Sequence, residues 1–321
     1  MPHLALKLGT RGSQLALWQA NTVAARVAAT GGPPCRIVVI HTSGDRLQDR
    51  PLSEEGGKRL FVKEIEDALL AGEIDLAVHS SKDMPALLPE GLAIGAVLPR
   101  EDPRDAVILS TSSSRPIADL PDLVAALGPA PDIGTSSVRR IAQLSRLLPG
   151  ARFRPIRGNL DTRLRKLDAG AHGALVLAAA GLRRLGFEAR ISLALPATAA
   201  IPAPGQGIVA IEIRADDEAT RAIVHRIDDG PASRALAAER ALVTALGGGC
   251  QTPIGALAWD LDSDHLELVA TVIAIDGSRA IRASGQARWT EAVDLGAAVA
   301  KRLLNDGAGD ILADAQRHHQ P

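Results

Sequence analysis

Short apolar segments alternate with amphipathic ones through the first two thirds of this chain. In the first unit, strands are predicted at 4–10, 36–42, 74–78 and 92–98, and helices from the N-cap Ser13 to about 27 and at 60–70. In a second unit, strands are predicted at 106–109, 132–134, 152–156 and 174–179, and helices at 141–148 and 160–167. Alternation at this spacing is typical of parallel-rich α/β sheets.

The organisation changes twice after residue 200. A strand expected at 208–213 follows a Pro- and Gly-rich break and returns to the first unit, which predicts two lobes with two crossings and a cleft between them. From about residue 230 the pattern indicates a helix at 233–246 and antiparallel strands at 257–259, 266–275 and 280–287. A closing helix is expected at 292–304. The predicted limits are 1–102 plus 206–226 for the first lobe, 103–205 for the second and 227–321 for the third domain.

Composition narrows the protein class. Apolar residues make up 46% of the 321 residues, but aromatic residues only 2%, so the cores must be aliphatic. Two cysteines in such a chain indicate a reducing compartment. The first seven residues lack the pattern of a secretory signal, and no run of 18 uncharged apolar residues occurs. We therefore predict a cytoplasmic protein without a membrane span.

Charge is unevenly distributed, although the net charge is only −1. Eleven arginines and Lys166 lie between Arg139 and Arg190, against three acidic residues, which leaves about nine excess positive charges there. The guanidinium group binds carboxylate or phosphate in a bidentate way. The cluster predicts a polyanionic ligand, although about half of these arginines fit solvated helix faces equally well.

Cys250 lies in a glycine-rich loop, GGGCQTPIG at 247–255. Glycines permit unusual backbone conformations and let another molecule approach closely. The thiol is therefore well placed to carry a ligand, although a free thiol against a helix end is an equal alternative from the loop alone. Cys35, at the start of a predicted strand, fits a half-buried apolar position.

Charged side chains follow the predicted strand that ends near Ser80. In open α/β sheets, ligands bind beyond the carboxyl ends of strands. There Asp83 could transfer protons or stabilise a cation, and Lys82 could hold an anion. His79 has no partners at metal-ligand spacing, so we expect a structural role for it and no metal site.

Two further turns have the chemistry of anion sites. The segments IGTSSVRR at 133–140 and IRGNLDTR at 156–163 each run from strand through a polar turn into a helix. Such turns offer free backbone N–H groups at the positive end of a helix dipole. Arg11 and Ser13 form a third turn on the opposite lobe. No phosphate loop or dinucleotide fingerprint occurs at these turns, which counts against nucleotides.

Taken in order, these motifs resemble the hydroxymethylbilane synthase (porphobilinogen deaminase) family over nearly the whole chain. The segments that carry the resemblance are TRGSQLALWQA at 10–20, GKRLFVKE at 57–64, VHSSKD at 78–83, REDPRD at 100–105, GTSSVRR at 134–140, RGN at 157–159, PGQG at 204–207 and GGCQTPIG at 248–255. The fold expected from the pattern and the resemblance is α/β. It has two periplasmic-binding-protein-like lobes with mixed, parallel-rich sheets, plus a small α+β C-terminal domain with an antiparallel sheet.

The resemblance also implies an activity. It predicts a transferase that joins four porphobilinogen units, with loss of ammonia, on a dipyrromethane cofactor, and then hydrolyses off the linear tetrapyrrole. It implies a covalent thioether to Cys250, with Asp83 stabilising the cationic methylene-pyrrole. The residues implied to bind the cofactor are Lys82, Asp83, Ser137, Arg139 and Arg140. Those implied to bind the substrate are Arg11, Ser13, Arg157, Arg163, Arg184 and Gln206. A lid over the cleft is implied around Lys58 and Phe61.

Some features depart from the family or leave alternatives open. Glu54 and Arg59 differ from the residues common at their positions, which leaves the contacts of the lid open. Two lobes with anion sites also suit a binding protein without catalysis, and a reactive thiol suits an acyl transferase. A nucleic-acid binder is disfavoured by the scarcity of aromatic residues. The expected partners are porphobilinogen and the growing polypyrrole, with no nucleic acid or membrane, and the chain is expected to be a monomer.

Overall fold

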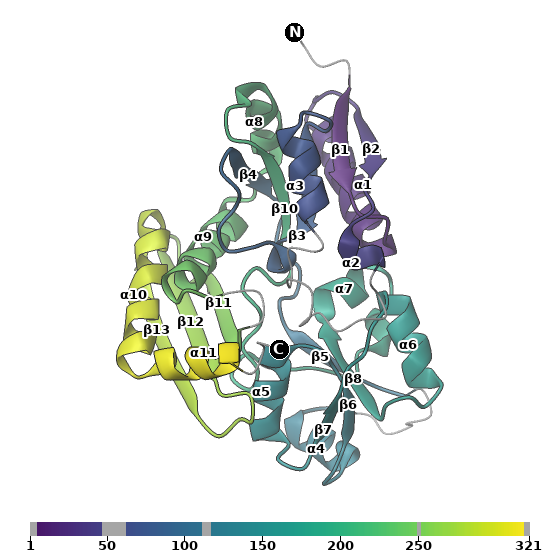
Figure 1. Ribbon diagram of the computed structural model, residues 1–321, viewed down its shortest axis with the longest axis vertical. Helices are drawn as coiled ribbons and strands as arrows, with labels where there is room; N and C mark the ends of the chain where they lie inside the picture. Colours follow the sequence, from purple (N-terminus) through teal and green to yellow (C-terminus); the bar gives the residue numbers. More distant parts are fainter. Residues whose placement is uncertain (1–4, 47–61, 111–116, 249–251, 318–321) are drawn as a thin grey trace.

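Three sheets organise the protein. The computed structural model describes residues 5–46, 62–110, 117–248 and 252–317 (Figure 1). Two five-stranded mixed sheets form the upper and lower lobes of Figure 1, and a three-stranded antiparallel sheet with its helices lies beside them. This arrangement confirms the predicted fold class. Within the described ranges, no helix is long and apolar enough to cross a membrane.

The first lobe contains the sheet with strand order β2-β1-β3-β10-β4. Its strands are β1 (Leu6–Thr10), β2 (Cys35–Val39), β3 (Leu76–Ser80), β4 (Leu92–Val97) and β10 (Val209–Arg214). Strands β1, β2 and β3 are parallel, whereas β10 runs antiparallel to both β3 and β4. The chain therefore does return from the second unit, because β10 occupies a central position of the first sheet.

Helices cover both faces of this sheet. The helices are α1 (Gln14–Ala29), the single turn α2 (Ser43–Arg46), α3 (Lys63–Leu70) and α8 (Glu218–Val224). Side chains of α1 and α8 pack with the strands in one apolar cluster, and those of α3 pack in another. Ser13 is the N-cap of α1, as predicted, and its Oγ accepts from the amide of Ala16 at 3.3 Å.

The second lobe contains the sheet with strand order β7-β6-β8-β5-β9. Its strands are β5 (Asp105–Leu109), β6 (Asp132–Gly134), β7 (Arg152–Arg154), β8 (Ala174–Ala178) and β9 (Leu193–Ala194). Its helices are α4 (Leu120–Leu127), α5 (Val138–Leu147), α6 (Leu160–Asp168) and α7 (Ala179–Arg184). Strands β6, β7 and β8 are parallel, and β5 is antiparallel to β8 and β9. The turns into α5 and α6 therefore lie side by side, because both follow the carboxyl ends of neighbouring parallel strands.

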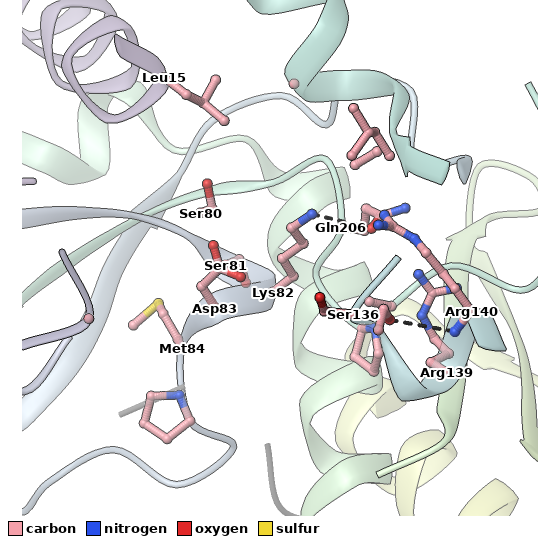
Figure 2. Close-up of a pocket in the computed structure, with 18 of the residues that line it drawn as sticks. Leu15, Ser80, Ser81, Lys82, Asp83, Met84, Ser136, Arg139, Arg140 and Gln206 are labelled. Carbon is pink, nitrogen blue, oxygen red and sulfur yellow. Dashed lines mark hydrogen bonds between the residues drawn. The ribbon is translucent and has the colours of Figure 1, made fainter. Parts of the chain in front are cut away.

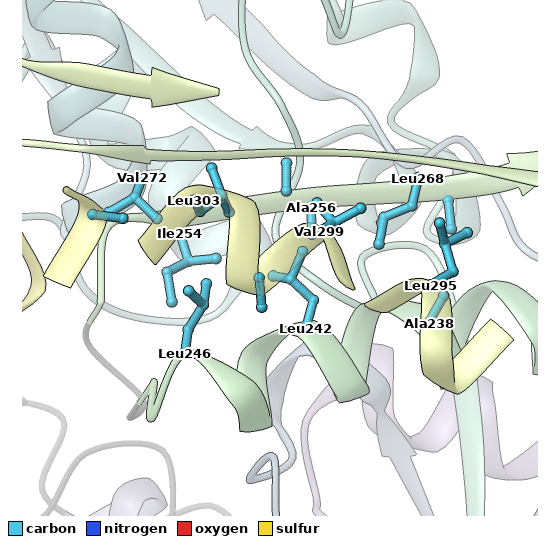
Figure 3. Close-up of a cluster of buried hydrophobic side chains, with 14 of the residues drawn as sticks. Ala238, Leu242, Leu246, Ile254, Ala256, Leu268, Val272, Leu295, Val299 and Leu303 are labelled. Carbon is cyan, nitrogen blue, oxygen red and sulfur yellow. The ribbon is translucent and has the colours of Figure 1, made fainter. Parts of the chain in front are cut away.

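The C-terminal sheet domain contains β11 (Ile254–Asp260), β12 (His265–Ile273) and β13 (Ala280–Arg288). Its helices are α9 (Gly230–Ala245), α10 (Ala292–Asn305) and α11 (Ala308–Arg317). Figure 3 shows leucines of α9 meeting Leu295, Val299 and Leu303 of α10 below the sheet. The helices come so close at Gly296 that a Cβ there would lie 2.2 Å from the carbonyl oxygen of Ala238.

Several predicted elements differ in detail. The helix at 292–304 does not close the chain, because α11 follows it and buries Ile311 and Leu312. Strand β11 begins at Ile254, three residues earlier than predicted. Helix α4 and the short strand β9 were not predicted. Four 3-10 turns complete the described elements, namely η2 (Ser81–Asp83), η3 (Glu188–Arg190), η4 (His225–Ile227) and η5 (Trp289–Glu291).

Candidate functional site

A cavity of about 890 Å³ is lined by residues of both lobes and of the C-terminal sheet domain. Most of the residues predicted from the sequence to form the site line it. They are Arg11, Ser13, Lys82, Asp83, Ser137, Arg139, Arg140, Arg157, Arg163 and Gln206. Figure 2 shows Lys82 and Asp83 on one side of this cavity and Arg139 and Arg140 on the other. Folding thus brings the Asp83 carboxylate together with several cations from distant parts of the chain.

Lys82 and Asp83 are placed by the carboxyl end of β3, where the strand turns into η2. The amide of Ser81 donates to the carbonyl of Ile208 at 3.0 Å, which attaches this turn to the chain entering β10. Ser80 accepts a hydrogen bond from the buried Gln19 of α1 at 2.8 Å. The turn is therefore fixed on both sides.

The charge of Lys82 depends on its surroundings. Burial lowers the pKa of Lys82 to about 8, Asp83 and Asp105 oppose this shift, and Arg140 and Arg139 reinforce it. The Lys82 Nζ atom lies 3.5 Å from Oε1 of Gln206. This ammonium group can therefore bind an anion at neutral pH and lose its proton in mildly alkaline solution.

The two predicted anion turns of the second lobe are joined to each other. Ser136 Oγ donates to the carbonyl of Ile156 at 3.1 Å and accepts from the amide of the same residue at 3.2 Å. Ser137 is the N-cap of α5, and its Oγ accepts from the amide of Arg140. Together the turns present hydroxyl and amide groups beside guanidinium groups, which suits a ligand that carries several carboxylates.

Arg139 and Arg140 share one buried counter-ion, Asp105, at the start of β5. Arg139 Nη1 donates to Asp105 Oδ2 at 2.6 Å, and Arg140 Nε donates to Oδ1 at 3.0 Å. Burial alone would raise the pKa of the Asp105 carboxyl, but the two arginines hold it well below its usual value. Asp105 is therefore ionised, and its negative charge offsets part of the positive charge of the two arginines.

Arg157 and Arg163 extend the cationic lining along the second turn. Arg163 Nε donates to the carbonyl of Gly158 at 2.8 Å, and burial lowers the pKa of Arg163 to about 10. Burial also lowers the pKa of Arg157. Arg163 and Arg140 disfavour each other's charge, so an anionic ligand between them would relieve repulsion.

Arg184 is the one described residue of the predicted substrate set that does not line the cavity. Its Nη2 donates to the carbonyl of Gly207 at 2.7 Å, and its guanidinium lies 5.6 Å from the ring centroid of Trp18. It therefore connects α7 of the second lobe to α1 of the first.

The sequence analysis missed a basic residue of the cavity. Arg240 of α9 lines the cavity, and its Nη2 donates to the carbonyl of Ala86 at 2.7 Å. Around it the wall is apolar, formed by Met84, Leu88 and Leu236, among others. The charged pair Glu239-Arg240 within the alanine-rich helix α9 was the available signal in the sequence. The helix pattern alone does not show which lobe Arg240 contacts.

His79 lies away from this cavity. It is buried within the first lobe, and its Nε2 is 3.1 Å from Oε2 of the equally buried Glu212 on the neighbouring strand β10. Among the described residues, no group of three or more His, Cys, Asp or Glu side chains could hold a metal ion.

Some predicted site residues lie outside the described residues. They are Cys250, Lys58 and Phe61, together with the departures Glu54 and Arg59. The described neighbours of the cysteine loop, Gly247, Gly248 and Thr252, line the cavity.

Comparison with solved structures finds binding proteins at low similarity. An ancestral cationic amino acid solute binding protein has 16% identity and a TM-score of 0.41, covering 70% of this chain and 88% of that one. A putative methionine-binding lipoprotein from Bacillus subtilis has 9% identity and a TM-score of 0.40, covering 69% and 90%.

Comparison with curated sequences and with family models is far more specific. Porphobilinogen deaminase from Syntrophobacter fumaroxidans is 46% identical over 318 residues, covering 99% of this chain and 100% of the relative. The enzyme of the same name from Brevibacillus brevis is 45% identical, covering 98% of each. The model of the porphobilinogen deaminase dipyromethane cofactor binding domain matches residues 6–222, and that of the porphobilinogen deaminase C-terminal domain matches residues 234–305. The chain belongs to the porphobilinogen deaminase family.

Proposed function

We propose that this protein is a transferase that joins four porphobilinogen units, with release of ammonia, and frees linear hydroxymethylbilane for tetrapyrrole biosynthesis. Family membership over nearly the full length supports this activity. The observation that carries the mechanism is a single cavity in which Asp83 lies opposite a cluster of arginines.

The lining fits the dipyrromethane cofactor of the family. Such a group carries carboxylate side chains on an apolar ring system, and the cavity offers cations and hydroxyls beside an apolar wall. Lys82, Ser137, Arg139 and Arg140 would hold its carboxylates. When bound, the cofactor supplies the primer to which substrate is joined.

Asp83 is the residue proposed to act on the reacting substrate. Loss of ammonia from porphobilinogen leaves a cationic methylene-pyrrole, whose positive charge needs an anion where it develops. Asp83 is held at the strand end by η2, and it faces a cavity otherwise rich in cations. Its carboxylate would stabilise the cation and accept or donate a pyrrole proton.

The acetate and propionate groups of the substrate need separate cationic partners. Arg11 and Ser13 on the first lobe, and Arg157 and Arg163 on the second, line the cavity and are proposed for this role. Arg184 was also predicted to bind substrate, but its contacts to Gly207 and Trp18 favour a role in holding the lobes together.

Further features of the proposal rest on the family resemblance. Cys250 is proposed to anchor the cofactor through a thioether, and the segment with Lys58 and Phe61 is proposed to cover the cleft. We also propose a cytoplasmic monomer with the three domains 1–102 plus 206–226, 103–205 and 227–321. The alternative of a two-lobed binding protein without catalysis has only fold similarity in its favour.

Mass spectrometry and turnover together test the proposal. The purified chain is expected to carry the extra mass of two pyrrole units and to convert porphobilinogen to a linear tetrapyrrole. Cys250→Ser should abolish the extra mass, whereas the matched control Cys35→Ser should retain it. Asp83→Ala should fold, keep its secondary structure and lose turnover. An unmodified active chain, or near-normal turnover by Asp83→Ala, would contradict the assigned roles.

A further inference from the structure

Asp105 is an unusually well-coordinated buried carboxylate. It is fully buried, and five nitrogen atoms contact it: Nη1 and Nη2 of Arg139, Nε and Nη2 of Arg140, and Nε2 of Gln206. Two buried guanidinium groups beside each other repel and need a shared anion. Asp105 provides that anion and fixes the direction in which both arginines point.

Gln206 connects this cluster to the opposite side of the cavity. Its Nε2 donates to Asp105 Oδ1 at 2.9 Å and to the carbonyl of Pro103 at 2.6 Å. Its Oε1 faces Lys82 Nζ at 3.5 Å, as the dashed line in Figure 2 shows. An amide suits this position, because one end must donate to a carboxylate while the other accepts from an ammonium group.

The two residues also lie on the two crossings between the lobes. Asp105 ends the first crossing, and Gln206 belongs to the second, in the turn that leads to β10. The crossings are attached to each other through Gln206 and Pro103, and also through the amide of Glu101, which donates to the carbonyl of Gly207 at 3.0 Å. The relative position of Lys82 and the arginines is thus set where the lobes join.

We propose that Asp105 and Gln206 are positioning residues that hold Lys82, Arg139 and Arg140 in the arrangement that binds the acidic pyrrole cofactor. Gln206, which the sequence predicted to contact the substrate, acts instead through Asp105 and Lys82. This inference rests on the proposed function and deepens it. The hydrogen bonds of Asp105 and Gln206 have charged partners and are buried from solvent. Their loss therefore displaces Lys82 and the two arginines, and does not simply remove one contact to the substrate.

The isosteric variant Gln206→Met tests the proposal, since it removes both ends of the amide and adds no charge. The readouts are the fraction of purified protein with the two-pyrrole mass, and the kcat and KM of the loaded fraction. We expect the loaded fraction to fall at least twofold and kcat to fall about 10- to 100-fold, with KM within about threefold of the wild type. A KM increase of about tenfold with unchanged loading and kcat would show direct substrate contact and overturn the proposal.

A charge exchange gives a second, independent test. Asp105→Asn removes the counter-ion, and Gln206→Glu places a carboxylate against Asp105, so each alone should reduce loading and kcat. The double variant places an amide opposite a carboxylate again and should recover at least tenfold in kcat over the worse single variant. A double variant that folds but does not recover kcat overturns the proposal. If the double variant does not fold, the proposal is judged on the kcat and KM of Gln206→Met.

A control separates positioning from general stability. Thr271→Val removes another fully buried hydrogen bond, from Thr271 Oγ1 to the carbonyl of Ile281, within the C-terminal sheet domain. Thr271→Val should leave the cofactor-loaded fraction, kcat and KM unchanged. If it lowers loading and kcat as much as Gln206→Met does, the effect of Gln206→Met is nonspecific and the proposal is overturned. A wild-type chain that carries the cofactor mass but does not consume porphobilinogen contradicts the proposed function alone, since loading of the variants is measured separately.

Discussion

The carboxylate of Glu239 joins three parts of the chain, and its removal is the strongest test of how the domains are held together. Glu239 lies on α9 and is fully buried. Its oxygens accept from Arg100 Nη1 at 2.6 Å, from the amide of Gly205 at 2.6 Å and from the amide of Ala258 at 2.8 Å. These partners come from the end of the first lobe, the second crossing and strand β11.

Glu239→Ala is expected to be strongly destabilising, because it leaves the largely buried guanidinium of Arg100 without its counter-ion and two backbone amides without their acceptor. Breaking a buried ion pair by removing one partner costs about 3–5 kcal/mol. With an unfolding entropy of about 2.1 cal/mol/K per residue over the 321 residues, this corresponds to a fall in Tm of about 4–8 °C. Scanning calorimetry of the full chain measures it directly.

A double-mutant cycle shows whether the loss of stability comes from the Arg100–Glu239 ion pair. Arg100→Ala should also destabilise, and the double variant should lose clearly less than both singles together, since neither charge is then left alone. The control Asp310→Ala breaks a longer, exposed ion pair to Arg279 at 3.6 Å and should cost less than about 1 kcal/mol. A Tm change below about 1 °C for Glu239→Ala, or strictly additive singles, would refute the reasoning.

Three further predictions concern the cavity. Gly205→Ala should lower Tm and activity together, because φ is +72° and the new Cβ would lie 2.5 Å from Ser81 Oγ. The control Gly186→Ala has a similar φ of +76° but open space around the new Cβ. It should lower the free energy of unfolding, measured by urea denaturation, by only about 1 kcal/mol through backbone strain. Since the pKa of Lys82 is lowered to about 8, its ammonium group loses a proton as pH rises through 8, and kcat/KM should fall over that range. If a Lys82→Arg variant shows the same fall in kcat/KM at alkaline pH, the fall does not come from Lys82. Arg240→Met should raise KM at least tenfold in steady-state assays with little change in Tm, and an unchanged KM would remove Arg240 from the site.

Much of the fold could be predicted because the buried strands are recognisable locally. The runs that became β3 and β10 are mainly apolar and are bounded by glycine or polar turns, which defines a strand without knowledge of its neighbours. Helix α11 was missed although Ile311, Leu312 and Ala315 follow helical spacing, because the glycines at 307 and 309 interrupt the pattern.

The site could be predicted less completely, since charges are balanced between distant residues. The turns at 134–140 and 156–163 were expected to bind anions, and they do lie together in the cavity. That Arg139 and Arg140 share Asp105 could not be read from the sequence, because the partners are 34 and 35 residues apart and meet only when α5 packs beside β5. Arg240 was missed for the same reason, as its contact at Ala86 lies 154 residues away.

The position of β10 between β3 and β4 has a consequence for biosynthesis of the chain. All strands of the second sheet lie within residues 105–194, whereas the first sheet stays incomplete until residues 209–214 have left the ribosome. The amino-terminal lobe therefore acquires its native core after the lobe encoded downstream of it, against the usual vectorial order. Nascent chains stalled before β10 would expose the edges of β3 and β4, and unpaired strand edges are templates for aggregation.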